Sequence, residues 1–259
     1  MKITIIGSGN VAAQLAEALV RQGAEVVQLY ARRREVAEEI ASPLGIEVAS
    51  IPEELAEADL YLVALSDRAI GEVVAQLPLP EGAVVAHTAG SVEMDVLAPY
   101  PHRGVFYPFQ TFTRGRKVEW SRVPILIEGS DSFAVDLLGR VASLLSREVH
   151  RANGEKRRKL HLVGVFACNF VNALYGVGEE LLHEADLSFD LLKPLIEETA
   201  RKAVEASSPC QVQTGPAVRG DRAVQERHLE MLADDPNKQA IYQQISQLIW
   251  ETSKRISPK

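Results

Sequence analysis

The chain has 259 residues, of which 46% are hydrophobic, and it carries a net charge of −7. A chain of this kind can bury a substantial core in one large domain or two modest ones, and its acidic balance argues against nucleic acid or an anionic membrane as a partner. Its two cysteines, Cys168 and Cys210, lack metal-ligand spacing and are too few for a disulfide framework, so we expect no metal site and a cytoplasmic protein.

The first predicted element is a short β-branched strand at residues 1–6, which leads directly into a glycine-rich turn. The strand is too short for the apolar region of a signal peptide, so we expect none. The turn matches the G-x-G-x-x-A pattern of dinucleotide-binding proteins through Gly7, Ser8, Gly9, Asn10, Val11 and Ala12. Gly7 allows the tight bend, and Gly9 allows the backbone to approach a pyrophosphate at the start of the next helix. Residues 7–11 therefore form the predicted pyrophosphate site; the alternative is a glycine-bearing turn of another α/β protein.

A second strand is expected at residues 25–30, and the residues after it distinguish the two nicotinamide cofactors. A site for NAD carries Asp or Glu here, which holds the 2′-hydroxyl of the ribose. This chain has Arg32 and Arg33 instead, and guanidinium groups bind a 2′-phosphate bidentately. The sequence therefore predicts NADP as the cofactor, unless the arginines are only the solvated start of the next helix.

Strand and helix signals alternate through the first part of the chain and change to helical signals alone near residue 152. Continuous apolar strands, typical of a sheet covered on both faces, are expected at 59–65, 83–87, 104–107 and 124–128. Helices are expected at 132–145, 155–184, 189–207, 222–232 and 236–256. The predicted fold class is α/β, a Rossmann-like doubly wound, mostly parallel sheet at 1–152, followed by an all-helical domain at 153–259.

Polar residues follow the predicted strands at the edge where such folds bind ligands. Leu65 and Ser66 lie where the cofactor ribose would pass, although Ser66 could simply cap the next helix. His87 and Thr88 follow the next strand, and a histidine titrates near neutral pH and could relay a proton. Gln110 belongs to an aromatic turn at 107–112 that could hold a substrate. The alternatives are a strand-ending turn for His87 and core aromatics for residues 107–112.

The helix expected from residue 155 carries polar residues within the most apolar stretch of the chain, 160–178. We expect this stretch to be buried in protein and not to span a membrane. On an ideal helix of about 100° per residue, His161, Cys168 and Asn172 share one face, with Asn169 to one side. His161 could protonate a developing alkoxide or amine, and the asparagines could orient a substrate. Alternatively, these residues satisfy one another at a helix–helix or dimer contact.

A loop at residues 213–221 contains two glycines and a proline, and we expect it to be non-helical. Thr214 and Arg219 supply polar groups that could reach a substrate. The alternative is a simple connection between helices in which Asp221 caps the next helix. The loop is longer and more polar than such a cap requires, which favours the functional interpretation.

Together, the runs at 7–12, 65–70, 87–91, 107–112 and 214–221 resemble a bacterial two-domain family. It joins a Rossmann-like NADP-binding domain to a helical domain of unknown function, DUF2520, and its architecture is similar to pyrroline-5-carboxylate reductase and deazaflavin-dependent NADP oxidoreductases. The resemblance implies an NAD(P)-dependent oxidoreductase that dimerises through its helical domain, with no settled substrate. Related β-hydroxyacid dehydrogenases use a lysine on this first long helix; Lys156 and Lys159 lie at its start, but neither aligns with the catalytic position.

We therefore expect an NADP(H)-dependent oxidoreductase that transfers a hydride between the nicotinamide and a carbonyl or imine of a small, carboxylated metabolite. The expected catalytic residues are His161, Asn169 and His87, and the expected substrate ligands are Thr88, Gln110, Thr214 and Arg219. The expected partners are this substrate and a second copy of the chain, with no nucleic acid and no membrane. Because no proton donor is unambiguous, the alternative is a non-catalytic NADP-binding sensor or assembly protein.

Overall fold

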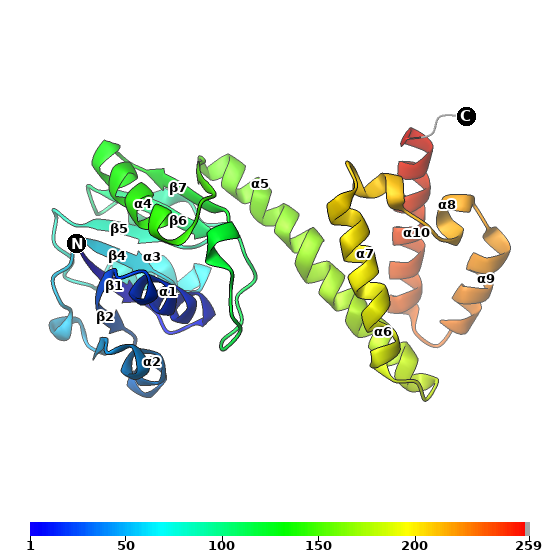
Figure 1. Ribbon diagram of the computed structural model, residues 1–259, viewed down its shortest axis with the longest axis horizontal. Helices are drawn as coiled ribbons and strands as arrows, with labels where there is room; N and C mark the ends of the chain where they lie inside the picture. Colours follow the sequence, from blue (N-terminus) through cyan, green and yellow to red (C-terminus); the bar gives the residue numbers. More distant parts are fainter. Residues whose placement is uncertain (257–259) are drawn as a thin grey trace. The chain divides into compact units, whose positions relative to one another are not determined.

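The structure, a computed structural model, describes residues 1–256 and divides into two compact units, Met1–Asn169 and Phe170–Lys259. The first unit contains the sheet, and the second contains helices (Figure 1). The last strand ends at Arg151 and a long helix begins at Gly154, beside the expected boundary at 152. The compact units divide later, within that helix, because its first turns belong to the sheet unit.

An eight-stranded sheet forms the centre of the first unit, in the order β3-β2-β1-β4-β5-β6-β7-β8. Its strands are β1 (Lys2–Ile6), β2 (Glu25–Tyr30), β3 (Glu47–Ala49), β4 (Leu60–Val63), β5 (Val84–His87), β6 (Arg103–Pro108), β7 (Ile125–Gly129) and β8 (Val149–Arg151). All neighbouring strands pair in parallel except β6 and β7, which are antiparallel. The strand order reverses between β1 and β4, as in doubly wound folds, and the predicted fold class is confirmed.

Helices cover both faces of this sheet. The helices of the first unit are α1 (Asn10–Arg21), α2 (Arg34–Ala41), α3 (Ile70–Val74), α4 (Ser132–Leu145) and α5 (Gly154–Gly164). Along β4, Leu60 and Leu62 pack in one apolar cluster with α1, α2 and α4, whereas Tyr61 and Val63 pack in a second cluster with α3. Alternate side chains of one strand are therefore buried on opposite faces, which explains its continuous apolar sequence.

Strand β8 was not expected from the sequence. Its residues are half-buried or exposed, and it pairs with β7 at one edge of the sheet. A short edge strand of this kind has no buried face to produce an alternating apolar pattern.

The second unit consists of α6 (Val171–Glu184), α7 (Lys193–Glu205), α8 (Pro216–Arg219), α9 (Arg222–Met231) and α10 (Pro236–Ile256), joined by short connections. Helix α8 lies within the segment that we expected to be non-helical, and that expectation is wrong. Pro216 occupies the start of α8, where its φ angle suits a helix, and Gly220 ends the helix in a left-handed conformation with a φ of 66°.

The apolar stretch at 160–178 lies in one helix that runs from Gly154 to Glu184 and includes a π-helical turn, Val165–Phe170. None of its most apolar window is buried within the chain, so the expected burial in protein is not provided by this chain alone. Its length and mean hydropathy of 1.5 would also suit a membrane span, which is weak evidence because core helices share these properties. The π turn also changes the helical register, so the common face inferred for His161, Cys168 and Asn172 on an ideal helix does not hold.

Candidate functional site

Strands β1, β4, β5 and β6 are mutually parallel, so their carboxyl ends meet at one edge of the sheet. The predicted glycine turn follows β1, and the segments that follow β4, β5 and β6 begin with Ala64, Thr88 and Phe109. The order of the sheet reverses at this edge, which is where doubly wound folds bind their ligands. The structure therefore brings the predicted segments of the first unit to a common edge.

The glycine turn has the geometry that a dinucleotide pyrophosphate requires. Gly7 has a φ of 129°, and a Cβ atom there would lie 2.2 Å from the carbonyl oxygen of Ala64 and 3.3 Å from the side chain of Leu65. Only glycine fits this place, where the N–H group of Gly7 donates to the carbonyl oxygen of Tyr30 at 2.8 Å. Gly9 is different, because a Cβ atom there would meet nothing within 4 Å. A ligand can therefore approach the backbone at Gly9.

Helix α1 starts beside this opening. Gly9 is its N-cap and supplies no side-chain acceptor, so no capping side chain competes with a phosphate for the first N–H groups. Asn10 is exposed and donates from Nδ2 to the carbonyl oxygen of Phe112 at 3.0 Å, while Val11 packs on the core. Ser8 is half-buried, and its carbonyl oxygen accepts from Arg114 at 3.1 Å. The residues present thus fit the pyrophosphate of a dinucleotide.

The three arginines after β2 have different environments. Arg34 donates to the carbonyl oxygen of Val48 and pairs with Glu54 at 2.7 Å, so it holds the fold. Arg32 and Arg33 are exposed, and neither guanidinium group forms a hydrogen bond or ion pair with any residue of the described chain, 1–256. Two free guanidinium groups at the end of β2 fit the 2′-phosphate of NADP. Arg34, in contrast, is occupied by contacts within the fold.

A hydrogen-bonded pair of side chains, Tyr107 and His161, lies at the same edge. The phenol oxygen of Tyr107, from β6, is 3.1 Å from Nδ1 of His161, from α5. Both side chains are half-buried, and burial raises the pKa of Tyr107 to about 12, so the phenol keeps its proton. Tyr107 can therefore donate a proton in a hydrogen bond, and His161 can donate to it or accept from it.

Gly90 supports this pair from the loop after β5. A Cβ atom on Gly90 would lie 2.7 Å from Nδ1 of His161 and 2.8 Å from Cζ of Tyr107, so the glycine backbone contacts both rings directly. Further along α5, a Cβ atom on Gly164 would lie 2.8 Å from the ring of Phe109. These two glycines allow α5 to lie close to the carboxyl end of β6, which brings the histidine to the phenol.

Arg157 lies one helical turn before His161 and is almost completely buried, with 1% of its surface exposed. Its guanidinium group pairs with Glu128 of β7 and donates to the carbonyl oxygen of Val92. The ion pair therefore holds the first turn of α5 against the sheet and against the loop that contains Gly90. The positive charge of Arg157 also lowers the pKa of Tyr107, opposing the larger effect of burial.

His87 and Thr88 are placed differently from the expectation. His87 has no exposed surface, its Nδ1 accepts from the N–H group of Ala89 at 3.2 Å, and burial lowers its pKa to about 4. The Thr88 hydroxyl is directed to the carbonyl oxygen of Val63 at 3.4 Å and is also buried. Both side chains shape the loop that carries Gly90, and neither presents a polar group at the surface.

The remaining predicted residues of this edge are exposed, except the half-buried Leu65. Ser66 occupies the N-cap position of residues 67–69, but its side chain forms no capping hydrogen bond. Asp67 accepts a hydrogen bond from Ser91. Gln110 is exposed, and its side-chain oxygen accepts from the N–H group of Thr111 at 2.8 Å. Lys156 and Lys159 are exposed on α5, whereas Arg157 and His161 face the sheet unit. Asn169 is exposed at the π turn, a feature frequently found at functional sites.

Thr214 and Arg219 belong to the second unit, and both are exposed. Asp221 caps α9, accepting from the N–H group of Val224 at 3.2 Å, which was the structural alternative for this residue.

Sequence reasoning missed two residues that the structure brings to the site. Tyr107 was read only as part of an aromatic turn, and Arg157 was not singled out. The available signals were the position of Tyr107 at the carboxyl end of a strand and the spacing of Arg157 four residues before His161, which places both on one helical face.

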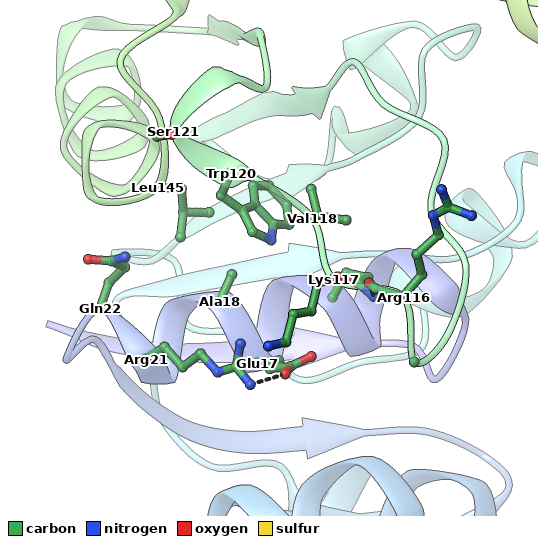
Figure 2. Close-up of a pocket in the computed structure, with 12 residues that line it drawn as sticks. Glu17, Ala18, Arg21, Gln22, Arg116, Lys117, Val118, Trp120, Ser121 and Leu145 are labelled. Atoms are coloured by element: carbon green, nitrogen blue, oxygen red, sulfur yellow. Dashed lines mark hydrogen bonds and ion pairs between the residues drawn. The ribbon is translucent and has the colours of Figure 1, made fainter. Parts of the chain in front are cut away.

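A separate groove of about 430 Å³ lies between α1 and residues 115–121, and Figure 2 shows the residues that line it. Its walls include Ala18, Trp120 and the ion pair of Arg21 with Glu17, whose atoms are 2.6 Å apart. These residues belong to the middle and end of α1, whereas the glycine turn precedes the helix. The groove is therefore distinct from the dinucleotide edge.

Comparison with known proteins assigns both parts of the chain to families. Residues 2–90 match the family described as NADP oxidoreductase, coenzyme F420-dependent, and residues 123–249 match the domain of unknown function DUF2520. No curated protein matches the chain.

Several solved structures are similar over nearly the whole chain. A protein of Bacteroides fragilis, provisionally named an NADP oxidoreductase, is 44% identical with a TM-score of 0.91, over 96% of this chain and 98% of that one. A protein of Thermotoga maritima is 22% identical with a TM-score of 0.84, over 97% and 99%. A reductive aminase of Aspergillus terreus, in complex with NADPH and ethyl-5-oxohexanoate, is 15% identical with a TM-score of 0.69, over 98% and 94%. The last two likenesses show the fold alone.

Proposed function

Because the chain belongs to the family that joins an NADP oxidoreductase domain of the coenzyme F420-dependent type to a DUF2520 domain, we propose that it is an NADP(H)-dependent oxidoreductase. The family resemblance predicted from the sequence motifs is confirmed. The reaction we propose transfers a hydride between the nicotinamide ring and a carbonyl or imine carbon of a small, carboxylated metabolite.

The observation that carries this proposal is the pair of Tyr107 and His161 at the edge of the sheet that also presents the glycine turn. Reduction of a carbonyl or imine needs a proton at the oxygen or nitrogen as well as a hydride at carbon. A phenol that keeps its proton, hydrogen-bonded to an imidazole, can supply that proton and be reprotonated. The sequence alone had offered no unambiguous donor.

The residues that would hold the cofactor follow from the described geometry. The turn at residues 7–11 would hold the pyrophosphate, Arg32 and Arg33 the 2′-phosphate, and Leu65 and Ser66 the ribose of the nicotinamide half. When bound, the nicotinamide would supply or accept the hydride, and the protein would supply position and electrostatics.

The proton path that we propose runs through Tyr107 and His161. In the reductive direction, the Tyr107 phenol gives its proton to the substrate oxygen or nitrogen. A protonated His161 then returns a proton from Nδ1 to the phenol oxygen and becomes neutral. Asn169 is proposed to orient the substrate, whereas His87 has no accessible atom for a direct role and is proposed to hold the Gly90 loop.

The cofactor proposal is tested by titrating the protein with NADPH and with NADH while following nicotinamide fluorescence. We expect tighter binding of NADPH, and we expect Arg32→Ala/Arg33→Ala to weaken NADPH binding about 10- to 100-fold with little effect on NADH. Arg122→Ala is the matched control, because that arginine is exposed and pairs only loosely with Glu119 at 3.9 Å. Absence of binding of either cofactor by folded protein would overturn the proposal.

Catalysis is tested by replacing the proton donors. We expect Tyr107→Phe and His161→Asn to lower the turnover of keto acids or imines by about 10²-fold or more while NADPH affinity is retained. Retained turnover in both variants would leave the non-catalytic sensor as the better account.

A second hydride partner is favoured by one observation, the match of residues 2–90 to an F420-dependent family. Under this alternative, the substrate is a deazaflavin coenzyme and not a carboxylated metabolite. An assay of F420 reduction by NADPH distinguishes the two, because the deazaflavin chromophore loses its absorption when reduced.

We also propose that the protein is a homodimer. Between residues 170 and 255, only Ala217 is buried, and large apolar side chains such as Leu174, Leu181 and Leu195 are exposed. A unit of this size needs to bury apolar surface in order to fold stably, so we infer that a partner covers these side chains. A second copy of the chain suits this role, because it is always present at the same concentration. The two cysteines are exposed and unpaired, which is compatible with the cytoplasmic location that we propose.

The mass in solution tests the dimer. We expect a dimer by analytical ultracentrifugation without detergent, and we expect Leu174→Asp to dissociate it, with Glu179→Gln on the same helix as the control. A stable monomer of the unsubstituted protein would overturn this assembly, and a requirement for detergent would favour a membrane as the partner instead.

A further inference from the structure

The helical unit contains a pocket of about 530 Å³ whose residues all come from α8, α9, α10 and the turn between α8 and α9. Its lining includes Arg219, Arg222, Gln225, Gln243, Gln247 and Trp250. The pocket lies wholly within the second unit, whereas the glycine turn, Tyr107 and His161 belong to the first. One of its lining residues, Arg219, is a substrate ligand expected from the sequence, whereas the proposed cofactor site and proton path use none of them.

The motif at residues 214–221 builds one wall of this pocket. Gly220 ends α8 with a φ of 66°, and a Cβ atom there would lie 3.1 Å from the ring of Trp250. Asp221 then caps α9, so that Arg222 is the first residue of that helix. The backbone of this turn therefore packs directly against Trp250 of α10. Arg219 precedes the turn, and Arg222 follows it.

The two arginines are not neutralised. Neither the Arg219 nor the Arg222 guanidinium group forms an ion pair or hydrogen bond within residues 1–256, and no Asp or Glu lines the pocket in this part of the chain. Two neighbouring carboxylates are engaged elsewhere, because Asp221 caps α9 and Glu251 accepts from Gln247. In a chain with a net charge of −7, this is a local concentration of positive charge with amide groups around it.

Part of the remaining lining is apolar, beside the hydroxyl-bearing residues Tyr242 and Ser246. Leu229 and Ala217 line it beside Trp250, and the ammonium group of Lys254 lies 4.3 Å from the centre of the Trp250 ring. Guanidinium groups recognise a carboxylate, and an aromatic wall recognises a hydrocarbon body. A ligand with only a charged group would leave this wall unused.

We infer that this pocket binds a small organic carboxylate, whose charged head pairs with Arg219 and Arg222 and whose hydrocarbon body lies on Trp250 and Leu229. The inference rests on the proposed function only in that the proposed substrate is a carboxylate. A carboxylate that binds here and is also reduced by NADPH is the substrate. One that binds without turnover is an effector.

Tryptophan emission tests the inference. The chain has two tryptophans, so Trp120→Phe leaves Trp250 as the only indole in the full-length protein. We would titrate this variant with pentanoate, with its uncharged match pentanamide, and with inorganic phosphate. The expected result is a saturable change in Trp250 emission with pentanoate and none with pentanamide. Arg219→Gln/Arg222→Gln should weaken pentanoate binding at least tenfold, and Arg227→Gln, on α9 but outside the lining, should not.

Three results would overturn the inference: no saturable response to pentanoate, an equal response to pentanamide or to phosphate, or unchanged affinity in the double variant. Circular dichroism checks that the double variant folds; if it does not, Arg222→Gln alone, at an exposed first position of α9, serves in its place. NADPH titration of the same samples separates this test from the cofactor proposal. Carboxylate binding without NADPH binding would refute the proposed oxidoreductase and leave the pocket standing.

Discussion

The phenol oxygen of Tyr107 lies 3.1 Å from Nδ1 of His161, although the two residues are 54 positions apart in the chain. Tyr107 comes from the end of β6 and His161 from the second turn of α5, and the backbone of Gly90 touches both rings. The pair therefore depends on three separate segments, and its geometry can be changed without altering either side chain.

Gly90→Ala is predicted to separate this pair. The added Cβ atom would lie 2.7 Å from Nδ1 of His161, so one of the rings must move. We expect turnover to fall toward the level of Tyr107→Phe, while NADPH affinity changes little. Gly82→Ala is the control, because a Cβ atom there meets nothing within 4 Å. Unchanged turnover in Gly90→Ala would show that the contact between phenol and imidazole is not needed.

The two glycines of the turn after β1 are predicted to fail in different ways. In Gly7→Ala, the Cβ atom would lie 2.2 Å from the carbonyl oxygen of Ala64, and the φ of 129° is strained, so we expect reduced stability. In Gly9→Ala, the Cβ atom enters open space at an ordinary φ of −81°, so we expect normal stability and lost NADPH binding. Thermal melting and cofactor titration measure both; full NADPH affinity in Gly9→Ala would contradict the proposed pyrophosphate site.

His87 is predicted to make stability depend on pH. Burial lowers its pKa from 6.5 to about 4, so as the pH falls through this window the unfolded chain gains a proton that the folded chain does not take up. The contribution of His87 to the free energy of unfolding is complete above pH 6.5 and falls by about 3 kcal/mol by pH 4. Urea unfolding at several pH values measures the loss. His87→Asn keeps an acceptor for the N–H group of Ala89 and should lose this part of the pH dependence; an unchanged dependence would contradict the assignment.

Arg157 is predicted to be the most sensitive ion-pair residue of the first unit. Arg157→Met leaves the Glu128 carboxylate without its partner, and we expect a loss of about 3–5 kcal/mol in the free energy of unfolding. Adding Glu128→Gln should recover part of this loss, since the unpaired charge is then removed. Arg158→Met is the control, because Arg158 and its partner Glu93 are largely exposed, and it should cost less than about 1 kcal/mol. Equal losses in the two single variants would show that the burial of Arg157 has no energetic consequence.

The sequence by itself determined the features whose signals are local. The glycine turn follows a buried strand and opens a helix, as its spacing predicted, and α4 spans the predicted residues 132–145. The change from strands to helices near residue 152 was also visible, because apolar runs give way to helical periodicity over many residues. Signals of this kind depend only on residues that are close in the chain, so they can be recognised without knowledge of the tertiary packing.

Only the tertiary structure decided which polar residues share a site. His87 and His161 were equal candidates in the sequence, yet one is buried with its Nδ1 on a backbone N–H group and the other meets Tyr107. The sequence could not distinguish Arg34 from Arg32 and Arg33, and only the structure shows that Arg34 contacts Val48 and Glu54. The π turn in the long helix and the antiparallel pairing of β7 changed registers that an ideal helix or a uniform sheet would assume. The physical reason is that strand order and helix register set contacts between distant residues, and local periodicity does not record them.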